Sequence, residues 1–236
     1  MINNKRLLAL IPARSGSKRL PHKNSLNFGG KPLIAWSIDA GLQSKYVDRV
    51  VVSTDSTTIA AIAKEYGADA PFVRPEILAS DTATIIDVVR HAINMLEKEN
   101  DFYDYILLLQ PTSPLRNTKH IDEAVELLIS KSAQGIIGIT EVEHPVEWTN
   151  ILPMDNSMEG FFPTEYRDIR SQDFPVRYRI NGAIYLNKIE NVLREGSLLL
   201  NKKCYAYIMP RSLSLDIDSK FDLDVAKSML DSSEKN

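Results

Sequence analysis

Near its start the chain reads Leu7-Leu8-Ala9-Leu10-Ile11, and this run passes directly into PARSGSKRLPHKN at residues 12–24. An unbroken apolar run that ends in polar sequence is typical of a strand buried on both faces, as in parallel sheets. In an open α/β sheet, ligands bind beyond the carboxyl ends of such strands. We therefore expect an α/β fold whose functional site lies beside residues 12–24.

Two similar apolar runs follow, VVV at residues 50–52 and YILLL at residues 105–109. Between the runs, apolar residues recur at helical spacing, first over residues 59–66 before Gly67 and then over residues 85–96. Further on, we expect Thr118 to cap a helix, and Ser219 with Asp222 to form a capping box before the last helix. This alternation predicts a Rossmann-like, mostly parallel sheet.

The bulk properties of the chain are those of an ordinary globular protein. Of its 236 residues, 44% are apolar and 25% are charged, and we expect a single domain over residues 1–236. The net charge of -3 offers no broad basic surface, so nucleic acid is not an expected partner. Cys204 is the only cysteine, which excludes an internal disulfide and fits a reducing compartment. The apolar run at residues 7–12 is too short to span a membrane and precedes no leader cleavage pattern, so we expect a cytoplasmic protein.

Residues 141–179 interrupt the alternation of strands and helices. This segment is rich in Pro, Glu, Asp and Arg, and its aromatic residues follow no clear period. A long structureless loop is improbable in a compact enzyme, so the segment is predicted to be an insertion that serves as a lid, a binding arm or an oligomerisation element.

The segment at residues 12–24 has the composition of an anion site. Arg14, Lys18 and Lys23 can offset the charge of a triphosphate, while Gly16 and the neighbouring serines let backbone N–H groups approach a phosphate. A charge run alone is more often a solvated face, but its position after a buried strand favours a site. Neither a G-x-G-x-x-G fingerprint nor a P-loop is present, which disfavours a dehydrogenase or a kinase. Phosphoryl or nucleotidyl transfer is the indicated chemistry.

Near the end of the chain, Asp216 and Asp218 are spaced so that both carboxylates lie on one face of an extended segment. Magnesium usually takes one or two protein carboxylates together with substrate phosphates and water, so the pair is a candidate Mg²⁺ site. The alternative is that one aspartate caps the final helix and the other lies on the surface. The phosphate-type segment at residues 12–24 favours the metal site.

The chain resembles the acylneuraminate cytidylyltransferases, also called CMP-sialic acid synthetases and including the legionaminate type, over nearly its whole length. The resemblance is carried, in order, by IPARSGSKRLPHKN (11–24), VVVSTD (50–55), RPEILASDTAT (74–84), LLLQPTSPLR (107–116), RSQDFP (170–175), NGAIYL (181–186) and LDIDSKFDLDVA (215–226). It implies a three-layer nucleotide-diphospho-sugar transferase fold and a homodimer in which residues 141–179 help to form the partner's sugar site. It also implies Mg²⁺ and transfer of CMP from CTP to the anomeric hydroxyl of a nonulosonic acid, N-acetylneuraminate first and legionaminate or a similar acid second, for glycan synthesis.

The same resemblance assigns roles to individual residues. It implies catalytic roles for Lys23, Arg14 and Asp218, nucleotide contacts for Ala13, Arg14, Lys18, Lys23, Asn24, Arg74, Ser80 and Thr84, sugar contacts for Gln110, Arg170 and Asn181, and metal ligation by Asp216 and Asp218. Read without the resemblance, Gln110 is a polar strand end and Asn181 a turn residue. Glu147 stands where some members carry lysine, and Ile85 where some carry serine, which leaves the preferred acid open.

Three alternatives remain. The synthetase of CMP-Kdo, which uses an eight-carbon acid, shares the IPAR and RLP elements, but Lys18, the Lys23-Asn24 pair and RSQD favour nine carbons. A glycosyltransferase of related fold would carry its Asp-x-Asp motif after a mid-chain strand, and Asp216 and Asp218 come later than that. A catalytically silent nucleotide-binding regulator would be expected to lose one of the charged groups, and all of them are present.

Overall fold

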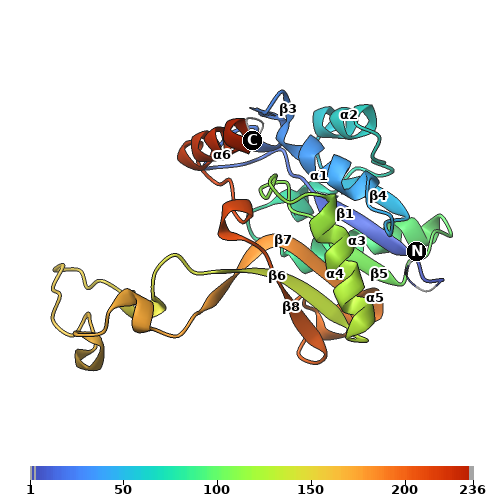
Figure 1. Ribbon diagram of the computed structural model, residues 1–236. Coiled ribbons are helices and arrows are strands. Elements are labelled where there is room, and N and C mark those ends of the chain that lie inside the picture. Colours follow the sequence, from blue (N-terminus) through green and yellow to red (C-terminus); the bar gives the residue numbers. More distant parts are fainter. Residues whose placement is uncertain (1, 3, 234–236) are drawn as a thin grey trace.

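The computed structural model describes residue 2 and residues 4–233 of the chain. In this part, a main sheet of six strands has the order β4-β1-β5-β7-β6-β8 (Figure 1). The strands are β1 (Leu7–Pro12), β4 (Arg49–Ser53), β5 (Tyr105–Leu108), β6 (Gly135–Glu141), β7 (Tyr178–Lys188) and β8 (Cys204–Ile208), with a separate hairpin of β2 (Asn27–Phe28) and β3 (Lys31–Pro32). The three apolar runs of the sequence are β1, β4 and β5, as predicted.

The sheet is mostly parallel. Strand β1 pairs in parallel with β4 on one side and with β5 on the other, and β6 pairs in parallel with β8. Strand β7 is antiparallel to both of its neighbours, β5 and β6. Because the chain passes from β1 to β4 and then across β1 to β5, the carboxyl ends of β1 and β5 border a crevice of the kind that binds ligands in α/β sheets.

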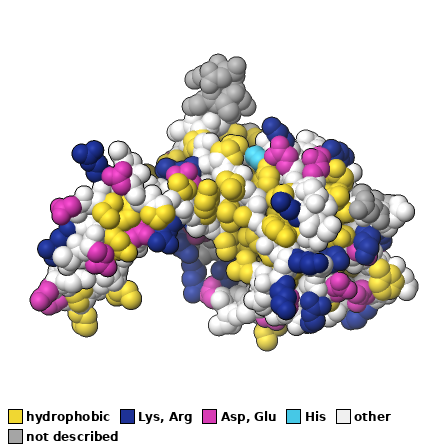
Figure 2. All heavy atoms as spheres, turned by 60° about the horizontal axis from the view of Figure 1, so that its bottom comes forward, with side chains coloured by type: hydrophobic (Ala, Val, Ile, Leu, Met, Phe, Trp, Pro, Cys, Tyr) yellow, Lys and Arg dark blue, Asp and Glu magenta, His cyan; other side chains and the backbone are white. Residues whose placement is uncertain are grey.

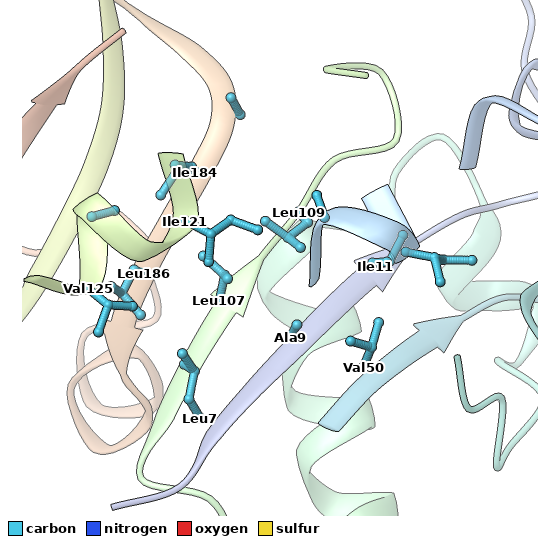
Figure 3. Packing of buried hydrophobic residues seen from close by; sticks show 14 of the residues in the cluster. Leu7, Ala9, Ile11, Val50, Leu107, Leu109, Ile121, Val125, Ile184 and Leu186 are labelled. Carbon is cyan, nitrogen blue, oxygen red and sulfur yellow. The ribbon is translucent and has the colours of Figure 1, made fainter. Parts of the chain in front are cut away.

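Helices cover both faces of the sheet, which gives the three layers that the resemblance implies. They are α1 (Leu33–Leu42), α2 (Thr57–Glu65), α3 (Ile85–Lys98), α4 (Thr118–Ser130), α5 (Ile189–Glu195) and α6 (Lys220–Ser233), and short 3-10 turns lie at Lys23–Ser25, Glu76–Ala79, Val146–Trp148, Thr164–Tyr166, Ser171–Asp173 and Arg211–Leu213. Side chains of α1, α2 and α4 share one core with the odd-numbered residues of β1, while α3 and α5 share another with Leu8 and Leu10. In Figure 3, Ile121 of α4 lies beside Leu107 of β5 and beside Leu109, the residue that follows this strand.

A third apolar cluster fixes helix α6 over the carboxyl end of the sheet. Leu223 and Ala226 of α6 pack there with Phe28, Leu33 and Ile217. Helix α6 is the C-terminal helix in Figure 1. This packing brings residues 215–219, which precede α6, close to the ends of β1 and β5.

Of the two predicted N-terminal caps, the one at α6 is correct and the one at α4 is wrong. The reciprocal hydrogen bonds between Ser219 and Asp222 form the expected capping box of α6. Helix α4 is capped by Asn117, whose side chain accepts from the backbone N–H of His120, so Thr118 is the first helical residue and not the cap. An asparagine in extended conformation can cap as well as a threonine, and here it lies one residue earlier.

Residues 142–177, between β6 and β7, project from the body as an extended arm (Figure 1). Three aromatic rings hold part of the arm together, because Phe174 lies edge-on to both Trp148 and Tyr166. Figure 2 shows hydrophobic side chains exposed on the arm and gathered on the neighbouring face of the body. Exposed apolar residues of the arm and of the start of β7 include Ile151, Leu152, Met154, Met158, Val176, Tyr178 and Ile180.

Within the described residues, every helix is too short or too polar to cross a membrane.

Candidate active site

A cavity of about 360 Å³ lies at the carboxyl ends of β1 and β5. Its walls come from four parts of the chain: the end of β1 and the segment after it, the segment between β4 and α3 with the start of α3, the segment after β5, and the segment before α6. Residues from each part line it, namely Pro12, Arg14, Lys23, Asn24, Arg74, Leu78, Ser80, Asp81, Ala83, Ile85, Val88, Gln110, Pro111, Thr112, Asp216 and Asp218. Most of the residues predicted from the sequence therefore face one hollow.

We call residues 12–24 the phosphate loop. Its two ends are tied together, because the side-chain amide of Asn24 donates to the carbonyl oxygen of Arg14 at 3.0 Å. Ala13 is buried, and its N–H donates to the carbonyl oxygen of Ser53 at 3.0 Å. The N–H of Ser15 donates to Asp55 at 2.9 Å. Contrary to our expectation from the sequence, this amide is therefore not free to bind a phosphate.

The cations of the phosphate loop are held by carboxylates. Asp81 pairs with Arg14 at 3.0 Å and with Lys18 at 2.6 Å, and these two hydrogen-bonded charges lower the pKa of Asp81. Lys23 is largely buried, with 12% of its side chain exposed, and its Nζ lies 2.9 Å from Oδ1 of Asp218. A triphosphate that enters this hollow meets cations already oriented toward anionic oxygens.

Asp216 and Asp218 both open onto the cavity, while Ile217 between them is buried in the α6 cluster. The segment alternates as predicted, and the N–H of Ile217 fastens it to the carbonyl oxygen of Thr112 at 2.8 Å. Burial raises the pKa of Asp216, and the nearby charge of Asp218 raises it further. The hydrogen bond from the Thr112 hydroxyl acts in the opposite direction and lowers it. Among the described residues, no Lys or Arg side chain forms an ion pair with Asp216, although the charge of Lys23 also acts to lower its pKa.

This donor set fits a hard divalent cation. No group of three or more His, Cys, Asp or Glu side chains with metal-site geometry occurs among the described residues. Two carboxylates, one of them without a cationic partner, are nevertheless the set that Mg²⁺ uses when phosphates and water supply the remaining ligands. The residues present are compatible with the metal that the sequence implies.

Arg74 also lines the cavity and is almost completely buried, with 3% of its side chain exposed. Its pKa is lowered, mainly by burial, and the charge of Asp55 opposes that shift. Ser80 also lines the cavity, and its hydroxyl donates to the carbonyl oxygen of Ile77 at 2.8 Å. Thr84 is the N-cap of α3 and lies between the lining residues Ala83 and Ile85.

Gln110 lines the cavity just beyond the end of β5, at the end of the third apolar run, as the sequence predicts. Gly182 of β7 makes room for its side chain: a Cβ atom on Gly182 would lie 2.6 Å from Oε1 of Gln110. Gly182 also has a φ of +76°, which disfavours any other residue. The glycine of the NGAIYL motif is therefore required both by the backbone and by Gln110.

The other two predicted sugar-binding residues lie outside the cavity lining. Asn181 is buried and its amide is satisfied internally, since its nitrogen donates to Ser214 at 3.0 Å and its oxygen accepts from the N–H of Ala183 at 3.1 Å. Arg170 is exposed on the arm. Asn181 therefore lies beside Gly182, near Gln110, but outside the lining of the cavity, and Arg170 lies on the arm.

Four residues that lie in or behind the cavity were not identified from the sequence. Asp81 and Thr112 line it, Asp55 supports Ser15 and Arg74, and Arg116 is fully buried behind Gln110. All four lie inside quoted motifs, but a carboxylate or hydroxyl within a motif gives no sign of which cation or backbone group it contacts. Only the packing of the loops reveals these contacts.

Comparison with known proteins points to the same kind of chemistry as the geometry of the cavity. Residues 8–207 match the model of the cytidylyltransferase family. A pseudaminic acid cytidylyltransferase of Campylobacter jejuni is 38% identical over 93% of this chain and 94% of its own length. A CMP-N,N'-diacetyllegionaminic acid synthase of Legionella pneumophila is 34% identical over 96% and 97%, respectively. An N-acylneuraminate cytidylyltransferase of Escherichia coli is 39% identical over 94% of this chain and 51% of its own length.

Solved structures resemble the fold as a whole. A CMP-2-keto-3-deoxy-manno-octonic acid synthetase in complex with CTP superposes with a TM-score of 0.70 and 16% identity, covering 97% of this chain and 99% of that chain. A 4-diphosphocytidyl-2C-methyl-D-erythritol synthase of Anaerococcus prevotii gives 0.67 and 14%, with 98% of both chains covered. At such identities the likeness concerns the fold alone, whereas the family match spans most of the sequence. The chain belongs to the cytidylyltransferase family.

Proposed function

We propose that this protein transfers CMP from CTP to the anomeric hydroxyl of a nonulosonic acid and releases pyrophosphate. The observation that carries the proposal is that Arg14, Lys23, Gln110, Asp216 and Asp218 open onto one cavity at the carboxyl ends of β1 and β5. Relatives of similar identity are named for pseudaminic, N-acylneuraminic and legionaminic acids, which supports a nonulosonate as the acceptor. We place N-acetylneuraminate first and legionaminate second, as the sequence motifs suggest.

In the proposed reaction the sugar hydroxyl attacks the α-phosphorus of CTP in line. A bond forms between the anomeric oxygen and the phosphorus, the bond to the β-phosphate oxygen breaks, and the hydroxyl proton passes to water. Arg14 and Lys23 bind the phosphates and offset their charge, so the protein contributes mainly by positioning and electrostatic stabilisation. Arg74 and residues 80–84 would hold the cytosine side, and Gln110 would contact the acidic sugar.

Asp216 and Asp218 would hold Mg²⁺. When bound, the ion would neutralise charge on the triphosphate and bridge it to the protein. Lys23 and Arg19, which contact Asp218 at 2.9 Å each, would then share that carboxylate with the metal. We also propose that the protein acts in the cytoplasm.

We further propose a homodimer in which the arm of each chain reaches its partner. The supporting observation is the run of exposed apolar residues along the arm, which a second copy would cover. Arg170, on the same arm, would then approach the partner's sugar site. Sedimentation of the full chain and of a chain with residues 150–162 replaced by a short Gly-Ser linker tests this: only the full chain should sediment as a dimer.

The function is tested by pyrophosphate release from purified protein with CTP and Mg²⁺. N-acetylneuraminate, legionaminate, pseudaminate and Kdo are offered in parallel, with UTP in place of CTP as the nucleotide control. We expect release with CTP and at least one nine-carbon acid, loss of release with EDTA, and recovery with excess Mg²⁺. Activity with Kdo alone would move the protein to the eight-carbon synthetases, and no release with any acid would overturn the proposal.

A further inference from the structure

The end of strand β4 lies between two walls of the cavity. On one side, the carbonyl oxygen of Ser53 accepts from the N–H of Ala13 at 3.0 Å, at the start of the phosphate loop. On the other side, the carbonyl oxygen of Thr54 accepts from the N–H of Arg74 at 2.8 Å. The backbone of residues 53–54 therefore joins the phosphate loop to the wall that carries Arg74.

The side chain of Asp55 forms a second link between the phosphate loop and the wall that carries Arg74. One carboxylate oxygen accepts from the N–H of Ser15 at 2.9 Å, and the other accepts from the Ser15 hydroxyl. The first oxygen also lies 3.7 Å from Nη2 of Arg74. Only 18% of the Asp55 side chain and 3% of the Arg74 side chain are exposed, so solvent weakens the attraction between these two charges little, whereas Ser15 is exposed.

The charges explain why a carboxylate is needed here. Arg14 and Arg74 both line the cavity, and the charge of Arg14 adds to the effect of burial in lowering the pKa of Arg74. Two cations that line one cavity repel each other. Burial opposes ionisation of Asp55, but its hydrogen bonds from Ser15 and the charge of Arg74 outweigh burial and lower its pKa. The ionised carboxylate of Asp55, which lies outside the cavity lining, offsets the repulsion between Arg14 and Arg74.

We infer that Asp55 is a positioning residue for the nucleotide: through Ser15 and Arg74, it fixes the spacing between the phosphate loop and the Arg74 wall. Asp55 does not line the cavity and need not touch CTP. The inference rests on the proposed function, because it takes CTP as the ligand of this cavity. It predicts that Asp55 governs how tightly CTP binds and has little effect on the chemical step.

The test compares wild-type protein with Asp55→Ala, Ser15→Ala and the double variant. Calorimetric titration with CTP and Mg²⁺, without any acid, reports binding, and pyrophosphate release reports KM for CTP and kcat. We expect Asp55→Ala to weaken CTP binding and raise KM about tenfold, the loss of one charge-assisted interaction, with kcat at saturating CTP within about threefold of wild type. Because Ser15 acts through Asp55, the double variant should be no weaker than Asp55→Ala alone.

Asp104→Asn is the matched control, since its carboxylate also accepts a backbone N–H, that of Arg6 at 2.9 Å, at the other end of the sheet. The control should leave CTP binding unchanged. If Asp55→Ala does not fold, Asp55→Asn takes its place, because it keeps the size and an acceptor but removes the charge beside Arg74. Additive effects of the Ser15 and Asp55 changes, or a fall in kcat at unchanged KM, would overturn the inference.

The outcomes also separate the two proposals. Wild-type protein that fails to bind CTP refutes the proposed function itself. Wild-type protein that binds and turns over CTP, alongside an Asp55→Ala variant that binds it equally well, refutes only the positioning role of Asp55.

Discussion

The Nζ atom of Lys23 donates a hydrogen bond of 2.9 Å to Oδ1 of Asp218, across 195 positions of the sequence. The contact joins the first loop of the chain to the segment before the last helix. It forms because the α6 cluster, with Ile217 in it, holds that segment beside the phosphate loop. The cation proposed for the phosphates and the carboxylate proposed for the metal thus lie at hydrogen-bond distance from each other.

Replacement of Asp218 by asparagine removes a charge that Lys23, Arg19 and the proposed Mg²⁺ share. We expect kcat to fall by about a hundredfold or more, as for the loss of one strong electrostatic contact at a reacting phosphate, and the Mg²⁺ concentration for half-maximal rate to rise. Pyrophosphate release over a Mg²⁺ titration measures both. Asp224→Asn is the control, because Asp224 pairs only with Lys220 on the surface of α6 among the contacts described. Wild-type turnover at limiting Mg²⁺ would show that Asp218 holds no metal.

Replacement of Asp81 by asparagine should have the opposite sign. Its carboxylate occupies Arg14 and Lys18, which a triphosphate must take over. Ion pairs this exposed contribute little, so we expect only a modest fall in KM for CTP, of up to about fivefold. Glu76→Gln, an exposed carboxylate in the same segment, should change little. A higher KM in Asp81→Asn would mean that Asp81 orients Arg14 for CTP instead of competing with it.

Gly182→Ala should act on the acid site through Gln110. The new Cβ would lie 2.6 Å from Oε1 of Gln110 and force that amide to rotate, so KM for the nonulosonic acid should rise more than KM for CTP. Gly30→Ala is the matched control: Gly30 also has a positive φ, of +85°, but a Cβ there meets nothing within 4 Å. Equal changes in both Michaelis constants, or the same effect in both variants, would argue against a sugar contact by Gln110.

The sequence predicted the framework of the site well, because that part depends on local patterns. The apolar run before Arg14 predicts a buried strand, and the alternation around Asp216 and Asp218 predicts that both carboxylates lie on the same face of their segment. The pairings of Asp55 and Asp81 could not be predicted, since they depend on how loops from different strands meet. For the same reason, the motif around Asn181 gave no sign that its amide is used up by Ser214 and Ala183.

Arg116 offers a test of stability behind the site. It is fully buried and has no carboxylate partner among the described residues; it donates to the carbonyl oxygen of Ala183 at 3.1 Å and to the Ser37 hydroxyl at 2.7 Å. Burial lowers its pKa to about 9, which shows how costly the enclosed charge is. Arg116→Met loses these hydrogen bonds, which costs about 1–3 kcal/mol of the free energy of unfolding. The same change removes the buried charge, which offsets part of that loss.

Arg116→Lys should therefore destabilise the protein more than Arg116→Met. Lysine keeps a charge to bury, and its ammonium cannot match the planar fork that reaches Ala183 and Ser37 together. Urea unfolding at pH 7.5 gives the two free energies of unfolding. The reverse order would mean that the fold depends on a cation at this position and not on the guanidinium geometry.

Helix α4 provides a prediction about pH. The N–H of Asn117 donates to Nδ1 of His120 at 3.1 Å, so this half of the capping box requires His120 to be unprotonated at Nδ1. Burial is the main cause that lowers the pKa of His120, and the charges of Arg116 and Lys119 lower it further, against Glu123. The folded pKa thus lies below that of the unfolded chain, about 6.5. The stabilising contribution is complete above that pH and is lost as the pH falls through the folded pKa.

His120→Gln separates this effect from general acid sensitivity. Glutamine at the third helical position can still accept from the N–H of Asn117, but it does not titrate. Between pH 7.5 and pH 5.5 we expect the urea midpoint of the wild-type protein to fall more than that of His120→Gln. Some pH dependence should persist in the variant, because burial also lowers the pKa of His91. His144→Gln, on the exposed arm, should behave like wild type. If His120→Gln and wild type lose stability equally, protonation of His120 does not open the cap of α4, and the acid sensitivity has its source elsewhere in the fold.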